Sequence, residues 1–133
     1  MEKLILIVDD ATAAAAVLRD AVLELAGTMD PSPAVRVEIA ASGEELLQRC
    51  ASQCPDLVVL DVNLPDLDGI DCFYRLRAQW PEVASHTVFL TGYAGSSEIT
   101  PRLQQALADG ARAVFRKPLR LADIEKLLHR HLR

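Results

Sequence analysis

Short apolar runs alternate with longer stretches of helical periodicity along the whole chain. The runs are Leu4–Val8, Val35–Ala40, Leu57–Leu60, Thr87–Leu90 and Ala113–Phe115. Most of them are continuously apolar and contain β-branched residues, without strict alternation of polar and apolar positions. This pattern is typical of strands that are covered on both faces, as in a parallel sheet.

A stretch with apolar residues at helical spacing follows each run. The predicted helices are about Thr12–Ala26, Gly43–Ser52, Ile70–Gln79, Ser97–Ala108 and Leu121–Leu132. Ser42 and Glu45 form a capping box at the start of the second helix. Pro81 is expected to stop the third helix, and Gly110 to close the fourth.

This alternation predicts an α/β protein with a doubly wound (βα)5 fold. Parallel neighbouring strands need right-handed crossover connections, so helices cover both faces of the sheet. In such a sheet the functional crevice lies outside the carboxyl ends of the strands. The 133 residues suffice for one ordinary domain, which we expect to span residues 1–133.

Charge and composition narrow the classes of partner. The net charge of −5 argues against nonspecific nucleic-acid binding, which needs a basic face. No apolar segment is long enough for a membrane span, and Leu4–Val8 is too short for a signal-peptide core. We therefore expect a cytoplasmic location. No His or Cys cluster completes a zinc set, so the three cysteines are interpreted as reduced structural thiols.

Polar side chains follow four of the five predicted strands. They are Asp9 and Asp10, Asp61, Thr91 and Lys117. The crevice rule for open parallel sheets brings these ends together. Three carboxylates, a hydroxyl and an ammonium group are thus expected to share one pocket.

Three carboxylates in one pocket repel one another, and a single lysine cannot neutralise them. A divalent cation can, and an incomplete shell of oxygen ligands suits Mg²⁺ shared with a phosphate. Lys117 and Thr91 then supply donors to the phosphate. Asp61 follows the central strand and is the candidate nucleophile that forms an aspartyl phosphate.

Four stretches, LILIVDD, PDLVVLDVNLPDLDG, VFLTGYAG and GARAVFRKPL, carry a family resemblance. Together they resemble the response-regulator receiver domains of two-component signalling, and the resemblance covers essentially the whole chain. It implies a flavodoxin-like five-stranded sheet in the order 2-1-3-4-5.

The resemblance also assigns the metal ligands. By position, Asp61 is the phosphoryl acceptor. Asp10 ligates Mg²⁺ directly, and Asp9 contributes through water. Asn63, two residues after the acceptor, offers its backbone carbonyl oxygen to the metal.

The residues around the phosphoryl group follow in the same way. Thr91 and Lys117 contact the phosphoryl oxygens, and Gly92 is small enough to leave access for the group. Pro65 and Gly69 shape the loop after the acceptor.

Such a domain receives its phosphoryl group from a histidine kinase or a phosphotransfer protein, and also from small phosphodonors. Phosphorylation is expected to shift the region from the fourth strand to the fifth helix and to report to a downstream effector. Val114 stands where the family usually has Tyr or Phe, which indicates a non-aromatic switch. Phe115, the next residue, is expected to point to the other face of the sheet.

Other properties follow as expectations or stay open. We expect no enzyme activity beyond Mg²⁺-dependent self-phosphorylation and self-dephosphorylation. The chain ends with the predicted fifth helix, so no effector domain is expected within it. Homodimerisation stays open, as does whether the domain stands alone or was cut from a larger regulator or hybrid kinase. The alanine-rich Ala11–Ala16 is a candidate docking surface for the phosphotransfer helix of a kinase.

Three alternatives compete with the hypothesis of a phosphorylated receiver domain. One is a phosphate-independent adaptor that uses a receiver fold for protein contacts. Another is a haloacid dehalogenase-like phosphatase, but here the acidic pair precedes the nucleophile, and Asn63 stands where that class has its general acid. A flavin-binding flavodoxin is weaker, because Asp9 and Asp10 repel a phosphate without a metal.

Three further aspartates flank the candidate acceptor. Asp56 is expected to be a turn residue at the start of its strand. Asp66 and Asp68 are expected to face solvent.

Overall fold

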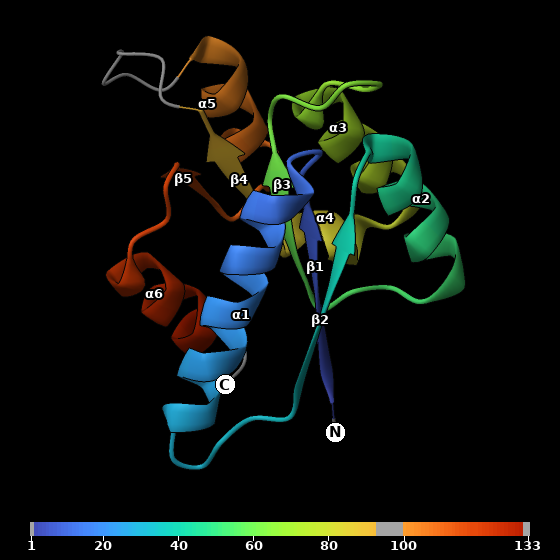
Figure 1. The fold of residues 1–133 in the computed structure, drawn as a ribbon. Coiled ribbons are helices and arrows are strands. Elements are labelled where there is room, and N and C mark those ends of the chain that lie inside the picture. Colours follow the sequence, from blue (N-terminus) through green and yellow to red (C-terminus); the bar gives the residue numbers. More distant parts are fainter. Residues whose placement is uncertain (1, 93–99, 132–133) are drawn as a thin grey trace.

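A five-stranded parallel sheet forms the centre of the protein (Figure 1). The computed structural model describes residues 2–92 and 100–131. Its strand order is β2-β1-β3-β4-β5, which confirms the doubly wound topology expected from the sequence. The strands are β1 (Lys3–Val8), β2 (Val35–Ala40), β3 (Leu57–Asp61), β4 (Thr87–Thr91) and β5 (Ala113–Arg116).

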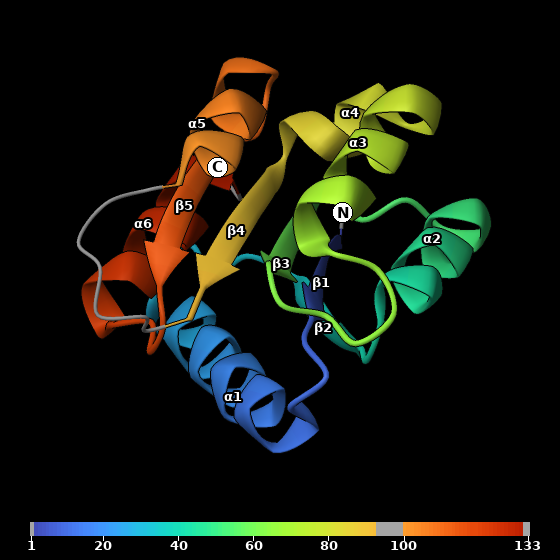
Figure 2. The ribbon, with the colours of Figure 1, turned by 90° about the horizontal axis from the view of Figure 1, so that it is seen from above.

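Helices cover both faces of this sheet (Figure 2). They are α1 (Thr12–Thr28), α2 (Gly43–Ser52), α3 (Gly69–Gln79), α4 (Pro81–Ser85), α5 (Pro101–Ala108) and α6 (Leu121–His131). Helices α1 and α6 lie on one face, and α2, α3, α4 and α5 lie on the other. Among the described residues, no helix is both long and apolar enough to cross a membrane.

The strands form two cores because their side chains alternate between the faces of the sheet. Leu6 and Val8 of β1 pack with α2, α3 and α5, whereas Ile5 and Ile7 pack with α1 and α6. Every residue of β3 is buried, which explains its unbroken apolar sequence. This rigid central strand supports Asp61 at its carboxyl end.

An additional short helix and a later helix start are the main differences from the sequence-based prediction. Pro81 does end α3, but it also begins the short helix α4, because proline is well suited to the first position of a helix. Helix α5 begins at Pro101 and is capped by the Thr100 hydroxyl, which accepts a hydrogen bond from the Leu103 amide. Thr100 is therefore a cap and not part of the helix. The predicted start at Ser97 lies outside the described residues.

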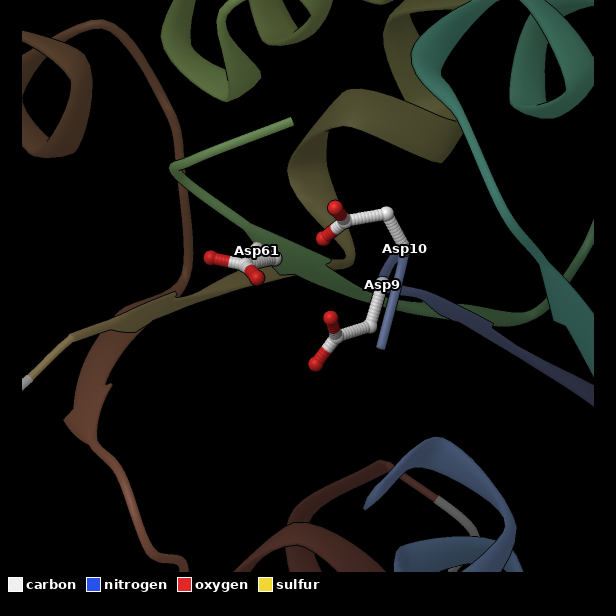
Figure 3. Close-up of side chains that lie close together, drawn as sticks. All are labelled: Asp9, Asp10 and Asp61. Atoms are coloured by element: carbon white, nitrogen blue, oxygen red, sulfur yellow. The ribbon is translucent and has the colours of Figure 1, made fainter. Parts of the chain in front are cut away.

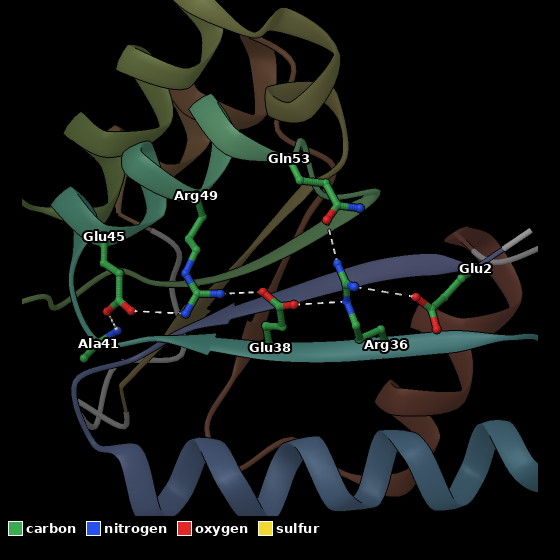
Figure 4. A network of polar contacts seen from close by, with 7 residues as sticks. All are labelled: Glu2, Arg36, Glu38, Ala41, Glu45, Arg49 and Gln53. Atoms are coloured by element: carbon green, nitrogen blue, oxygen red, sulfur yellow. Dashed lines mark hydrogen bonds and ion pairs between the residues drawn. The ribbon is translucent and has the colours of Figure 1, made fainter.

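The outer strand β2 carries a ladder of alternating charges beneath α2 (Figure 4). Arg36 pairs with Glu38 at 3.0 Å, and Glu38 also pairs with Arg49 of α2. Arg49 reaches Glu45, and Arg36 extends the ladder to Glu2. Charged side chains on an edge strand discourage pairing with another sheet, so we interpret this ladder as structural.

Candidate functional site

The polar residues predicted at the strand ends do meet at one edge of the sheet. Asp9 directly follows β1, Asp61 is the last residue of β3, Thr91 ends β4 and Lys117 follows β5. The strands end at nearly the same level, because Val8 pairs with Leu60 in the register of the sheet. The parallel topology thus brings side chains from distant parts of the sequence together.

Three carboxylates form the centre of this site. One oxygen each from Asp9, Asp10 and Asp61 lies within 4.8 Å of the others (Figure 3). Asp9 and Asp61 are each only 3% exposed, whereas Asp10 is exposed. The cluster is therefore closed toward the sheet and open to solvent at Asp10.

Lys117 bridges the two buried carboxylates. Its Nζ donates to Asp61 Oδ2 at 2.6 Å and to Asp9 Oδ2 at 3.0 Å. Backbone amides satisfy the other oxygens, since the Ala11 amide donates to Asp9 and the Asn63 amide donates to Asp61. The ammonium group and these amides make the burial of two neighbouring carboxylates tolerable.

Burial and charge shift the protonation equilibria of the acceptor and the lysine. Burial raises the pKa of Asp61 above its ordinary value, and the hydrogen bonds from Lys117 and Asn63 offset only part of this effect. Burial alone would lower the pKa of Lys117, but its hydrogen bonds to Asp61 and Asp9 outweigh burial and raise it. Lys117 therefore remains a cation at neutral pH.

The loop from Val62 to Asp68 forms a wall of the site. It lines an open pocket of about 510 Å³ together with Asp10. The Gly69 amide donates to the Val62 carbonyl oxygen at 2.9 Å and closes the loop. A Cβ atom on Gly69 would lie 2.3 Å from the carbonyl oxygen of Asp61, so this turn requires glycine. This geometry supplies a physical reason for the glycine that the sequence singled out.

Thr91 and Gly92 lie beside the carboxylates but do not bind them in this structure. The Thr91 hydroxyl donates to the carbonyl oxygen of Gly92 at 3.0 Å. A Cβ atom on Gly92 would meet the Asn63 side-chain amide at 3.6 Å, which is an ordinary contact. The Thr91 hydroxyl would therefore have to rotate to reach a group on Asp61.

The neighbouring aspartates have structural contacts, and the expectation that they face solvent is confirmed for Asp66 but wrong for Asp68. Asp56 accepts a hydrogen bond from the Leu4 amide at 2.8 Å and so ties β3 to β1. Asp66 is exposed, yet its carboxylate binds the amides of Gly43 and Glu44 at the start of α2. Asp68 is half-buried and caps α3 through the Ile70 amide.

The donor set fits a hard divalent cation. Three carboxylates and one bound ammonium group leave a formal excess of two negative charges. Oxygen ligands on one side and open space on the other match the incomplete protein shell that Mg²⁺ usually accepts. Asp9, Asp10 and Asp61 are the residues that could hold it.

Comparison with known proteins agrees with this geometry. The sequence model of the response regulator receiver domain matches residues 5–129. The chain belongs to this family. The family match and the sheet order together establish a receiver domain of two-component signalling, for which a histidine kinase and a downstream effector are the implied partners.

Individual relatives show the same assignment. A CheY-like receiver domain protein from Methanospirillum hungatei JF-1 superposes with a TM-score of 0.79 and 29% identity, over 99% of this chain and 94% of that one. The alkaline phosphatase synthesis transcriptional regulatory protein PhoP of Bacillus subtilis is 42% identical over 59% of this chain. That match covers 30% of PhoP, so PhoP extends well beyond the part that this chain matches.

The relatives correct the expectation that the chain is not an enzyme. A protein-glutamate methylesterase/protein-glutamine glutaminase of Rhodospirillum rubrum is 33% identical over 86% of this chain, a match that covers 28% of that protein. The similarity to this enzyme lies in its receiver domain, since the receiver-domain model covers nearly all of this chain. Receiver domains similar to this one thus occur within enzymes, and the expectation is wrong in that respect.

The two residues before the end of β5 lie as the sequence predicted. Val114 is half-buried and packs on the core beneath α5. Phe115 packs in the opposite core with α1 and α6. This receiver domain therefore has no aromatic ring on the α5 side of β5, where its family usually has one.

Proposed function

We propose that this receiver domain takes a phosphoryl group on Asp61 and responds to it with a change of conformation. The observation that carries the proposal is the placement of Asp61. Its carboxylate ends the fully buried central strand, contacts Lys117 and lies within reach of Asp9 and Asp10. These groups provide a nucleophile, a cation and a metal site in one place.

In the proposed transfer, one Asp61 oxygen forms a bond to phosphorus while the bond from phosphorus to the donor's histidine nitrogen breaks. The electron pair of the broken bond stays on that nitrogen. The imidazole leaves as the neutral base when its other nitrogen carries a proton, and otherwise takes a proton from water to become neutral. Mg²⁺ held by Asp9, Asp10 and Asp61, with the Asn63 carbonyl oxygen as a further ligand, would offset the charge on the phosphoryl oxygens. Lys117 would move from the Asp61 carboxylate to the phosphoryl group, where it supplies a positive charge.

The response is proposed to start at Thr91. Phosphorylation adds about two negative charges, which attract hydroxyl and amide donors. The Thr91 hydroxyl would then exchange its bond to Gly92 for one to the phosphoryl group. Since β4 leads into α5, the shift would pass to α5, β5 and α6. Val114 is aliphatic, so this relay would work without an aromatic ring.

A labelling experiment tests the acceptor. The parent protein, Asp61→Asn and Asp68→Asn are incubated with acetyl phosphate and Mg²⁺, and intact masses are measured. We expect one phosphoryl group on the parent and on Asp68→Asn, and none on Asp61→Asn. Equal labelling of Asp61→Asn and the parent would overturn the assignment.

The donor is proposed to dock in a groove beside α1. This groove has a volume of about 600 Å³. The residues that line it include Val17 and Leu18 of α1, Pro118 and Leu119, and Asp9 and Lys117 of the carboxylate site. Val17 is 71% exposed, which is unusual for a large apolar residue on a helix. An apolar groove that leads to the acceptor suits a helix that carries a phosphohistidine.

Two variants of α1 test this docking surface. Val17→Glu should slow phosphotransfer from a histidine kinase or phosphotransfer protein, but not labelling by acetyl phosphate. Leu23→Glu is the matched control, because Leu23 is 41% exposed on the same helix and does not line the groove. Equal transfer rates to both variants and the parent would contradict the proposal.

The remaining properties are part of the same proposal. A single domain over residues 1–133 and a cytoplasmic location stay predictions, and homodimerisation stays open. The matches cover 28% and 30% of the two curated relatives named above. The activity of a longer protein that contains this domain therefore stays open. The adaptor and phosphatase alternatives gain no support from the family match.

A further inference from the structure

The start of α2 is completed by a side chain from another segment. The first amides of a helix have no partner within the helix itself. Asp66 Oδ1 accepts from the Gly43 amide at 3.1 Å, and Asp66 Oδ2 accepts from the Glu44 amide at 3.0 Å. Ser42 accepts from the next amide, that of Glu45. Both oxygens of Asp66 are thus used to hold its loop against α2.

Close packing at Gly43 fixes the same contact independently. Gly43 is buried, and a Cβ atom there would lie 3.1 Å from Leu67 Cβ. That distance is tighter than most real contacts, so the loop approaches α2 this closely because residue 43 is glycine. Hydrogen bonds and packing therefore hold Asp66 and Leu67 in one position.

The segment held in this way is the wall of the candidate metal site. It runs from Val62 to Asp68, lines the pocket beside Asp10 and carries Asn63. At its far end the loop is closed by the hydrogen bond from the Gly69 amide to Val62. The contacts of Asp66 with α2 fix the middle of the loop, between Asn63 and this closure.

We propose that Asp66 is a positioning residue, which holds the loop of Asn63 in place for Mg²⁺ through the amides of Gly43 and Glu44. This inference rests on the proposed function and adds a residue to it. Asp66 does not touch the metal or the phosphoryl group. Its loss lets the loop move away from Asp10, which weakens Mg²⁺ binding while Asp61 remains intact.

Two variants disturb this contact from opposite sides. Asp66→Asn replaces one carboxylate oxygen by an amide group that cannot accept the second hydrogen bond. Gly43→Ala places a methyl group against Leu67 and changes no charge. Glu44→Gln is the matched control, because it removes a negative charge at the same helix end from an exposed side chain and keeps the amide contact.

Mg²⁺ affinity is measured from amide chemical shifts of residues around Asp10 and Asn63 during titration with the metal alone. Removal of a group that orients a metal ligand typically weakens binding by tenfold or more. We expect Mg²⁺ binding to weaken about tenfold in Asp66→Asn and Gly43→Ala, and to change little in Glu44→Gln. Urea unfolding of each variant separates this effect from a general loss of stability.

The outcomes separate this inference from the proposed function. If Asp66→Asn and Gly43→Ala lose stability but bind Mg²⁺ as the parent does, the positioning role is wrong and the proposed function stands. If Glu44→Gln weakens binding as much as Asp66→Asn, charge alone explains the effect and the positioning role is also wrong. If the parent binds no Mg²⁺, the metal part of the proposed function fails together with this inference.

Discussion

At the scale of single residues, the site depends on one cation that serves two buried carboxylates. Asp9 and Asp61 are both nearly inaccessible to solvent, and Lys117 contacts both of them. Two carboxylates in such a position repel each other unless a positive charge lies between them. Lys117 provides that charge, and a bound divalent cation would add to it.

Replacement of this lysine should therefore destabilise the fold. Lys117→Met leaves two buried carboxylates without their cation, and removal of one partner of a buried ion pair costs several kcal/mol. The lysine side chain is 32% exposed, so we expect a smaller loss of about 1–3 kcal/mol at neutral pH. Urea unfolding with and without Mg²⁺ measures the loss, and Mg²⁺ should restore part of it. Unchanged stability would show that the carboxylates do not need the lysine.

Two glycines provide a matched pair for the geometry of the acceptor loop. A methyl group on Gly69 meets the Asp61 carbonyl oxygen, whereas a methyl group on Gly27 meets nothing within 4 Å. Gly69→Ala should cost about 1–3 kcal/mol through forced backbone movement, and Gly27→Ala in α1 should stabilise by about 0.5 kcal/mol. Thermal unfolding of both variants measures these two changes in stability. Equal stability of the two would mean that the turn at Gly69 adapts freely.

At the scale of elements, the sequence predicted the strands well because their burial is simple. The apolar runs, most of them continuous, located all five strands to within one residue at either end. The ends of helices were harder, since Pro81 is compatible both with ending α3 and with beginning α4. Thr100 likewise became a cap, which periodicity within a helix cannot reveal.

The candidate site was also predictable only in part. The positions of the carboxylates and the lysine followed from topology, because parallel strands bring their carboxyl ends together. The contact of Asp66 with α2 joins residues 23 apart in sequence and gives no periodic signal. Gly43 at the first position of a helix was the available hint, because glycine there permits a close approach.

A hydrogen bond between helices links α5 to α3. The Tyr74 hydroxyl donates to Asp109 Oδ2 at 2.6 Å, and Gln105 reaches the same oxygen at 3.2 Å from within α5. The hydrogen bond from Tyr74 holds the pKa of Asp109 below its usual range. This bond fixes the end of α5 that is remote from the acceptor.

Loss of this bond should loosen α5. In Tyr74→Phe we expect faster hydrogen exchange of the α5 amides, with little change in α1. Gln105→Ala is the control, because it removes the weaker contact to the same carboxylate from within the helix. Equal exchange rates in α5 for the parent and Tyr74→Phe would contradict a restraint by α3.

At the scale of the whole molecule, two cores separate the two sides of the sheet. Cys50 and Cys72 lie in the core beneath α2 and α3, whereas Cys54 is exposed. Burial raises the pKa of each buried thiol to about 12. The fold favours these thiols in their protonated form, so their contribution to stability is present below pH 9 and lost as pH rises toward 12.

Thiol labelling reports on this packing. At pH 8 a thiol reagent should modify Cys54 in the folded protein and all three cysteines in urea, because the thiolate is the reactive form. The number of modified residues is read by mass spectrometry. Rapid modification of Cys50 or Cys72 in the native state would show that the core opens readily.

Phosphorylation at Asp61 is proposed to switch the conformation of the α5 side of the sheet. The most direct measurement compares amide chemical shifts of the parent protein before and after Mg²⁺ and beryllofluoride, a mimic of the phosphoryl group. We predict large shifts at Asp61 and Thr91 and coordinated shifts through α5, β5 and α6, all absent in Asp61→Asn. Shifts confined to the pocket, with α5 and β5 unchanged, would contradict the switch and favour a phosphate-independent adaptor.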